Sequence, residues 1–237
     1  MLNLLRCEFA KLRRKPLFFA AAAVSALIPL GCALFLPDFR EFTSGAEAVD
    51  GMMSTLFQMS AYLLLMPALA MAKMALLLLF SIAFMAAGGL VILLIVLAAG
   101  WEPVGFWRLF LVGIGQGIMM WAGALPCILL VVLLNRSYIV SVIITFFYTS
   151  VNYIFGLNNL FITQPFGLNL GTLLPGPLTF RWYFQYLDFS NAGAEMLGLL
   201  ERVSPYFVTT AQAFLVTGAE AAVFLALIAL VYKRQGV

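Results

Sequence analysis

Residues 55–99 run almost without charge, interrupted only by Lys73. A helix crosses a bilayer with about 20 apolar residues, so this stretch is too long for one crossing. We predict a hairpin of two membrane spans, at about residues 55–72 and 74–99, that turns near Pro67 to Lys73. Hydrophobic residues make up 64% of the chain and charged residues 10%, far from the balance of a soluble domain. The sequence therefore indicates an all-α, polytopic membrane protein.

The amino-terminal residues 1–15 have the pattern of an amphipathic helix. Their apolar side chains recur at helical spacing and share one stripe, at Leu2, Leu5, Phe9 and Leu12. The basic side chains fall outside this stripe, as in a helix that lies in the membrane interface among anionic headgroups. Residues 16–37 carry no charge, and we expect an uncleaved first span there. The basic end is predicted to stay in the cytoplasm.

Three further apolar stretches predict spans at about residues 108–134, 137–157 and 207–232. The polar residues 38–54 are expected to be a connection on the outer side. Residues 161–206 combine three prolines with a run of aromatic side chains. We expect re-entrant or interfacial helices there, packed against the bundle on the outer side. These segments make one transmembrane domain, residues 1–237, with six spans.

The distribution of charge agrees with six spans and two cytoplasmic termini. This topology places nine of the 13 Lys and Arg residues inside and eight of the ten acidic residues outside. An excess of Lys and Arg in cytoplasmic loops is the rule for membrane proteins. The fourth span also contains Gly113 and Gly117, a spacing that either admits another helix closely or is simple packing filler.

The sequence offers little for catalysis or metal binding. It contains no histidine, which removes the commonest general base and metal ligand. It also lacks a phosphate-binding loop of the G-x-x-x-x-G-K-[ST] type. The three cysteines have no paired spacing and are interpreted as small apolar fillers. We expect no catalytic residues, no metal site and no cofactor in this chain. The basic cluster is explained by a membrane surface, so nucleic acid is not an expected partner.

Glu220 is the clearest acidic residue within a predicted span. An acid at this depth is costly and is by default a functional candidate, so it could line a substrate path. Alternatively, it is protonated, or bonded to a neighbour such as Gln116 or Asn152, and holds helices together. Both readings stay open from the sequence.

The chain as a whole resembles the permease subunits of ATP-binding-cassette exporters, in the branch of the lantibiotic and bacitracin self-immunity permeases. The resemblance rests on the opening run LRCEFAKLRR at residues 5–14 and on a fourth span that carries LPCI at residues 125–128 before Asn135-Arg136. The six spans, the proline-rich segment before the last span and the ending Lys233-Arg234 add to it.

This resemblance implies a dimeric membrane domain in the bacterial plasma membrane, made of two identical or two related permease chains. Separate cytoplasmic subunits would bind ATP and Mg²⁺ and supply the energy. The substrate would be an amphiphilic peptide or another amphiphile, moved among membrane lipids. Residues expected to couple to the ATPase are Glu8, Lys11, Arg14, Lys73, Asn135 and Arg136. Residues expected along the substrate path are Gln116, Asn152, Trp182, Tyr183, Tyr186 and Glu220.

The chain departs from this family at one point. Such permeases carry a polar cytoplasmic stretch between spans two and three that docks on the ATPase, whereas residues 69–75 here are nearly all apolar. Either coupling relies on the amino-terminal segment and the Asn135-Arg136 turn, or polar residues are missing from the sequence. We expect the second, which a mass above 26.0 kDa would support. A secondary transporter or channel and a non-transporting membrane scaffold remain the alternatives.

Overall fold

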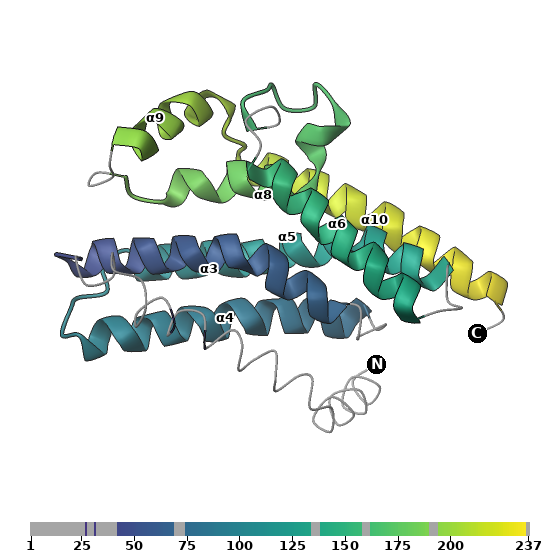
Figure 1. The fold of residues 1–237 in the computed structure, drawn as a ribbon, viewed down its shortest axis with the longest axis horizontal. Helices are drawn as coiled ribbons and strands as arrows, with labels where there is room; N and C mark the ends of the chain where they lie inside the picture. The colour runs from purple at the N-terminus through teal and green to yellow at the C-terminus, as the bar shows by residue number, and fades with distance from the viewer. Residues whose placement is uncertain are drawn as a thin grey trace. The chain divides into compact units, whose positions relative to one another are not determined.

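The computed structural model describes residues 27, 31, 42–68, 74–133, 138–157, 162–189 and 194–235. Within these residues every regular element is a helix, which confirms the all-α class (Figure 1). The long helices are α3 (Gly45–Ala68), α4 (Met74–Ala98), α5 (Phe106–Leu133), α6 (Tyr138–Leu157) and α10 (Thr210–Gln235). The short ones are η2 (Leu170–Leu173), α8 (Pro175–Tyr183), η3 (Phe184–Tyr186), α9 (Ala194–Val203) and η4 (Ser204–Tyr206).

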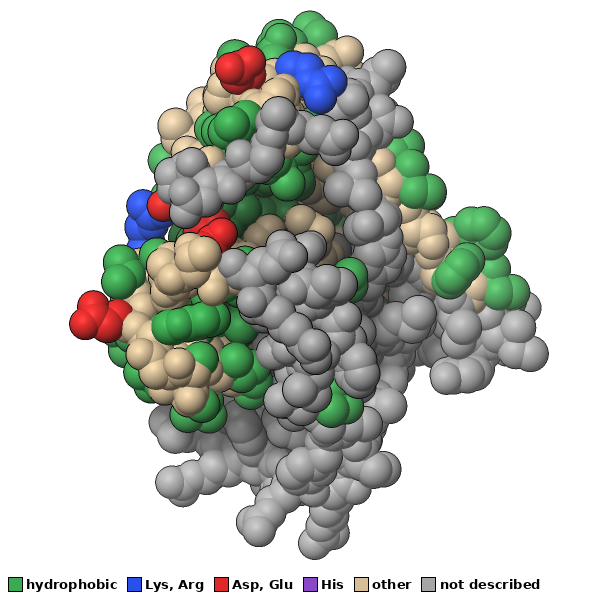
Figure 2. All heavy atoms as spheres, turned by 60° about the vertical axis from the view of Figure 1, so that its left-hand side comes forward, with side chains coloured by type: hydrophobic (Ala, Val, Ile, Leu, Met, Phe, Trp, Pro, Cys, Tyr) green, Lys and Arg blue, Asp and Glu red, His purple; other side chains and the backbone are tan. Residues whose placement is uncertain are grey.

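Three helices of the described part are long and apolar enough to cross a membrane. They include residues Leu77–Ala98 of α4, Phe106–Leu130 of α5 and Thr210–Arg234 of α10. The surface that the described residues present in Figure 2 is mainly hydrophobic, with a few separate charged side chains. These helices agree with a membrane protein, and the count of six spans stays a prediction. The predicted first span, residues 16–37, lies outside the described residues except for residues 27 and 31.

The chain forms two compact units, and α3 and α5 each contribute to both. Unit 1 contains residues 1–59 and 73–117, and unit 2 contains residues 60–72 and 118–237. In unit 1, α3 and α4 run side by side (Figure 1), and a Cβ on Gly88 of α4 would lie 2.8 Å from the Leu56 side chain of α3. Two helices thus lie where the hairpin was predicted, with α3 ending at Ala68 and α4 beginning at Met74, and their crossing of the membrane as two spans stays a prediction.

Small residues bring α5 close to its neighbours in unit 1. A Cβ on Gly117 would lie 2.9 Å from the backbone oxygen of Ser81 in α4, and one on Gly113 would lie 3.2 Å from the Phe57 ring. Of the two readings left open for these glycines, these distances favour the close approach of another helix. The buried amide of Gln116 lies one residue before Gly117 and donates from Nε2 to the Phe57 carbonyl at 2.8 Å.

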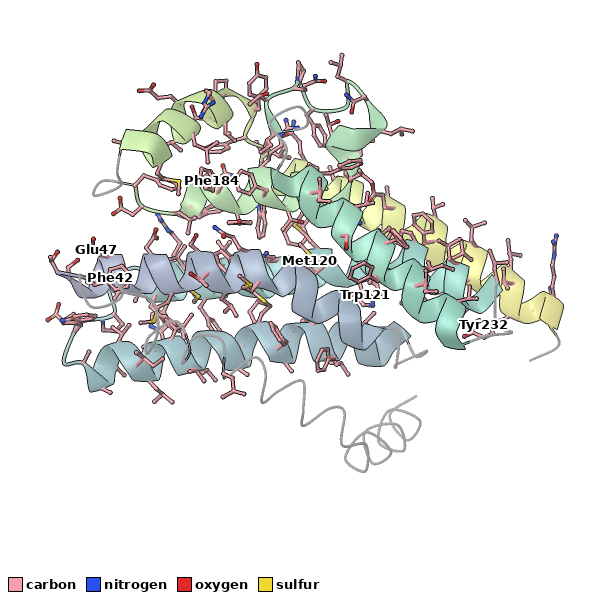
Figure 3. All side chains as sticks on the ribbon, in the orientation of Figure 1. Phe42, Glu47, Met120, Trp121, Phe184 and Tyr232 are labelled. Carbon is pink, nitrogen blue, oxygen red and sulfur yellow. The ribbon has the colours of Figure 1, made fainter. Side chains whose placement is uncertain are left out.

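The start of α3 differs from the expectation that residues 38–54 are only a connection. Helix α3 begins at Gly45. At this start, two side-chain oxygens accept hydrogen bonds from backbone amides. The backbone N–H of Glu47 donates to Ser44 Oγ at 3.3 Å, and the Glu47 carboxylate accepts from the Thr43 backbone at 3.1 Å. Such reciprocal bonds satisfy amides that a helix start leaves open. Phe42 lies beside this turn (Figure 3), and its ring packs against Gly51.

Candidate functional site

The polar contacts of unit 2 gather around the short helix α8. Its sequence begins Pro175-Gly176-Pro177, which suits a helix start because the amide that proline lacks would be unpaired in the first turn anyway. Seven of its residues, Pro177 to Tyr183, are buried. Helix α8 packs against both α6 and α10. It therefore links the helix before the outer segment, residues 161–206, to the last long helix.

The first residues of α8 lie directly against α6. The backbone N–H of Gly176 donates to Asn152 Oδ1 at 3.4 Å, and Asn152 Nδ2 donates to the Tyr148 carbonyl at 3.2 Å. A Cβ on Gly176 would overlap the Asn152 carbonyl oxygen. A Cβ on Gly156 would lie 3.3 Å from the Gly176 carbonyl carbon. Only a glycine at position 176 fits this close approach of the two backbones.

Helix α5 meets α6 and α8 at Gly123, three residues before its internal proline. Pro126 lies inside α5 and cannot donate the backbone hydrogen bond of its turn. The Tyr148 hydroxyl of α6 donates to the carbonyl of Gly123, three residues earlier. A Cβ on Gly123 would also lie 2.6 Å from the Pro175 ring. A side chain from a neighbouring helix thus bonds a backbone carbonyl next to the proline.

The carboxyl-terminal end of α8 and the residues after it are hydrogen-bonded to the start of α10. Trp182 Nε1 donates to Thr210 Oγ1 at 3.2 Å, and the Tyr186 hydroxyl lies 2.6 Å from the same oxygen. Gln185 Nε2 donates to the Val208 carbonyl at 2.9 Å. The ring of Trp182 packs edge-on against Phe214, with the ring centroids 5.5 Å apart. We call this set of contacts, made by residues 182–186 with residues 208–214, the α8–α10 joint.

The aromatic run that follows α8 forms a packed cluster. Phe184, labelled in Figure 3, stacks on Phe180 with centroids 4.6 Å apart and contacts Phe189 at 4.7 Å. Trp182 and Tyr183 are buried, and Tyr186 is half-buried. Trp182 and Tyr183 are thus packed within unit 2, and their place along a substrate path stays a prediction. Their apolar area is covered by other parts of the outer segment and by α10.

Arg181 is the buried charge of this region. Its side chain is 1% exposed. Its Nε donates to the Tyr206 carbonyl at 2.7 Å, and its guanidinium lies 5.8 Å from the centroid of the Phe166 ring. Among the described residues, Nη1 has no hydrogen-bond partner. Burial lowers the pKa of this guanidinium, but arginine stays protonated at neutral pH. A buried donor left unpaired costs about 1–3 kcal/mol, and more for a charged group.

The predicted substrate-path residues fall into both units. Asn152, Trp182, Tyr183, Tyr186 and Glu220 belong to unit 2, and Gln116 belongs to unit 1. The structure brings Trp182 and Tyr186 together at Thr210. Glu220 is half-buried on α10 and makes no hydrogen bond with a described residue of its own unit. The side-chain amide of Asn152 instead bonds α6 and α8, and no hydrogen bond joins it to Glu220.

The residues expected to couple to an ATPase lie outside the described residues, so the structure says nothing of them: Glu8, Lys11, Arg14, Lys73, Asn135 and Arg136. In the part of the chain that the structure covers, no group of three or more His, Cys, Asp or Glu residues could hold a metal ion. Cys127 is buried and forms no disulfide bond.

Sequence reasoning missed two features of this site. The predicted topology places Arg181 outside, as one of the four basic residues that are not cytoplasmic. The burial of its side chain was not predicted. A basic residue between Phe180 and Trp182 was the available signal, because a charge inside an aromatic run must be either exposed or paired. Sequence reasoning also missed the start of α10, where Thr209 Oγ1 accepts from the Gln212 backbone at 3.3 Å and Gln212 Oε1 accepts from the Thr209 backbone at 3.1 Å.

Comparison with known proteins gives a match over part of the chain, from residue 66 to residue 152. No curated protein and no solved structure matches the chain. Residues 66–152, from the end of α3 through α4 and α5 into α6, match the family model of the ABC-2 family transporter protein. This match supports an ABC-2 type permease, the membrane component of a transporter rather than its catalytic part.

Proposed function

We propose that this chain is the membrane-spanning permease subunit of an ATP-binding-cassette exporter that expels an amphiphilic peptide of the lantibiotic or bacitracin type, or another amphiphile. The observation that carries the proposal is the match of residues 66–152 to an ABC-2 family transporter. The matched segment contains α4 and α5, both long and apolar enough to cross a membrane. ATP and Mg²⁺ would bind in separate cytoplasmic ATPase subunits.

The proposed assembly contains two permease chains, identical or related, in a bacterial plasma membrane with both termini in the cytoplasm. Closure of the ATPase dimer would reach the spans through the amino-terminal segment, through Lys73 and through the Asn135-Arg136 turn. The nine basic residues that this topology places inside support the orientation. Nucleotide-driven closure can move a substrate only if the two conformations bind it with different affinity.

Contacts around α8 support a path for such a motion within unit 2. Asn152 and Gly176 join α6 to the first turn of α8, and the α8–α10 joint connects its other end to Thr210. A displacement of α6 would therefore be passed to the start of α10. Packed elements of this kind switch between discrete arrangements rather than deform continuously. Within unit 2, we place the substrate path beside Asn152, Trp182, Tyr183, Tyr186 and Glu220.

The proposal is tested by purifying the chain after co-expression with candidate ATP-binding subunits. We expect a stoichiometric ATPase that stays bound in detergent, and ATP-dependent movement of fluorescent bacitracin in reconstituted vesicles. A variant of the ATPase without its phosphate-binding lysine is the matched control and should abolish transport without loss of binding. Flux driven by a proton or sodium gradient without ATP would contradict the exporter and support a secondary transporter. Stable binding of other membrane proteins with neither kind of flux would support a scaffold.

A further inference from the structure

The buried guanidinium of Arg181 has more donors than the described residues use. Its Nε bonds the Tyr206 carbonyl, the Phe166 ring lies over its face, and Nη1 has no partner in the described part of the chain. None of its contacts there is with a carboxylate. We propose that the Nη1 edge of Arg181 binds the phosphate group of a membrane lipid, which gives this buried cation its counter-ion.

The chemistry of the side chain favours a phosphate. A guanidinium offers its donors in a planar fork that fits phosphate and carboxylate oxygens two at a time. Buried charges in proteins are normally paired, and phosphate is the anion that every phospholipid presents at the membrane interface. The carbonyl of Tyr206 takes the Nε donor and leaves the Nη edge for such a ligand. Thr179 Oγ1 also lacks a partner among the described residues, but it lies two positions along α8, on the opposite side of the helix.

The loop that carries Phe166 supports a lipid rather than a free ion. Leu168 and Leu170 lie on this loop with 66% and 83% of their surface exposed. Two large apolar side chains on a turn suit contact with acyl chains, whereas a soluble phosphate would gain nothing from them. A single phospholipid would bring both the anion for Arg181 and the chains for these leucines.

Access to Arg181 would depend on the Phe166 ring. The backbone of its loop is held by side-chain bonds: Gly167 N–H donates to Thr172 Oγ1 at 3.0 Å, and Thr172 N–H donates to Asn169 Oδ1 at 3.1 Å. The loop backbone is thus fixed, while the Phe166 ring itself is only half-buried. Rotation of this ring, rather than movement of the loop, would uncover the guanidinium.

The experiment compares lipid binding to the purified full-length chain by native mass spectrometry and by the shift in its melting temperature. The probes are phosphatidylglycerol, a diacylglycerol with the same acyl chains, and inorganic phosphate. We expect phosphatidylglycerol to be retained and to stabilise the protein, diacylglycerol not to be retained, and inorganic phosphate to bind much more weakly. Equal effects of phosphatidylglycerol and diacylglycerol would overturn the proposal, and inorganic phosphate as effective as the lipid would overturn the lipid as the ligand.

Arg181→Gln is expected to weaken phosphatidylglycerol binding by on the order of tenfold or more, the loss of one charge-assisted hydrogen bond. Arg202→Gln is the matched control, because Arg202 is an exposed arginine of α9 in the same outer segment. It removes the same charge and should leave binding unchanged. Equal losses in the two variants would show only a general effect of charge and would overturn a site at Arg181.

Two further measurements keep the test decisive if Arg181→Gln does not fold. Phe166→Ala removes the covering ring and keeps the guanidinium, so it should speed the exchange of labelled phosphatidylglycerol. Dipolar coupling between the lipid phosphorus and ¹⁵N-labelled arginine should be present in the unmodified chain. Unchanged exchange together with no such coupling would overturn the proposal. None of these measurements needs ATP or transport, so the result is independent of the proposed exporter function.

Discussion

The side-chain oxygen of Asn152 in α6 accepts a hydrogen bond from the backbone N–H of Gly176, the second residue of α8. The carbonyl of the same asparagine lies against the Gly176 α-carbon, where a Cβ would overlap it. One residue of a long helix thus contacts the start of a short helix through both its side chain and its backbone. This pair fixes where α8 begins relative to α6.

Gly176→Ala is expected to destabilise the protein by about 1–3 kcal/mol, because the added methyl group meets backbone atoms that cannot move aside easily. The melting temperature of the purified chain in detergent measures the effect. Gly198→Ala is the matched control, since a Cβ on Gly198 in α9 meets nothing within 4 Å. That substitution should be neutral or stabilise by up to about 1 kcal/mol. Equal melting temperatures for the two variants would contradict the close packing of α6 on α8.

Tyr148→Phe should cost about 0.5–1.5 kcal/mol, because it removes the hydrogen bond to the Gly123 carbonyl beside Pro126. Replacing Pro126 by Ala supplies a backbone donor for the carbonyl of Ala122 rather than for that of Gly123, so the cost of Tyr148→Phe should be nearly unchanged in that background. A double-mutant cycle on the melting temperature separates the two contributions. Phe147→Leu, at a neighbouring side chain that is 62% exposed, is the control and should change little. A coupling well above about 0.5 kcal/mol would contradict this independence of the tyrosine and the proline.

Thr210→Val tests the α8–α10 joint. The change keeps the shape of the side chain but removes the oxygen that Trp182 and Tyr186 share. We expect a loss of about 1–3 kcal/mol, because the buried indole N–H is left without its acceptor. Ser204→Ala removes an exposed hydroxyl from the preceding turn and should stay within about 0.5 kcal/mol of the unmodified chain. A melting temperature for Thr210→Val as high as that of Ser204→Ala would show that the α8–α10 joint does not stabilise the protein.

Glu220→Gln separates the two roles left open for this residue. Glu220 has no hydrogen bond to a described residue of unit 2, so an uncharged isostere should leave the melting temperature and ATPase binding unchanged. If a contact between the carboxylate and the substrate lowers the barrier to transport by about 1.4 kcal/mol, the loss of this contact slows transport about tenfold. Transport assays in vesicles measure this, with the exposed Glu201→Gln as control. An unchanged transport rate would exclude Glu220 from the substrate path.

The sequence predicted long elements well and short ones poorly. The hairpin of α3 and α4 could be placed because apolar length alone determines how many crossings a chain can make. The beginning of α3 was missed because residues 38–54 are polar on average, although Ser44 and Glu47 have the spacing of a helix cap. Composition reports the environment of a segment, whereas a cap is a local hydrogen-bond pattern.

The candidate functional site shows the same difference between what composition predicts and what local contacts determine. Interfacial helices in residues 161–206 were expected from their prolines and aromatic side chains, and short helices are present there. Which side chains these helices bury could not be predicted, because a helix of two or three turns has too few residues to show a periodic apolar face. Trp182, Tyr183 and Arg181 are buried by segments distant in the sequence, above all by residues 206–214.

The capped start of α3 has a consequence for mapping which ends of the helices face each side of the membrane. An epitope or reporter enzyme inserted between Gly45 and Ser54 would interrupt a continuous helix and report on a damaged chain. The turn that ends at Val104 is a sounder insertion point, because Val104 is exposed and lies before Phe106, the first residue of α5. Reporters placed before Gly105, whose carbonyl accepts the first hydrogen bonds of α5, would read the side of the α4–α5 connection and leave the interior of both helices continuous.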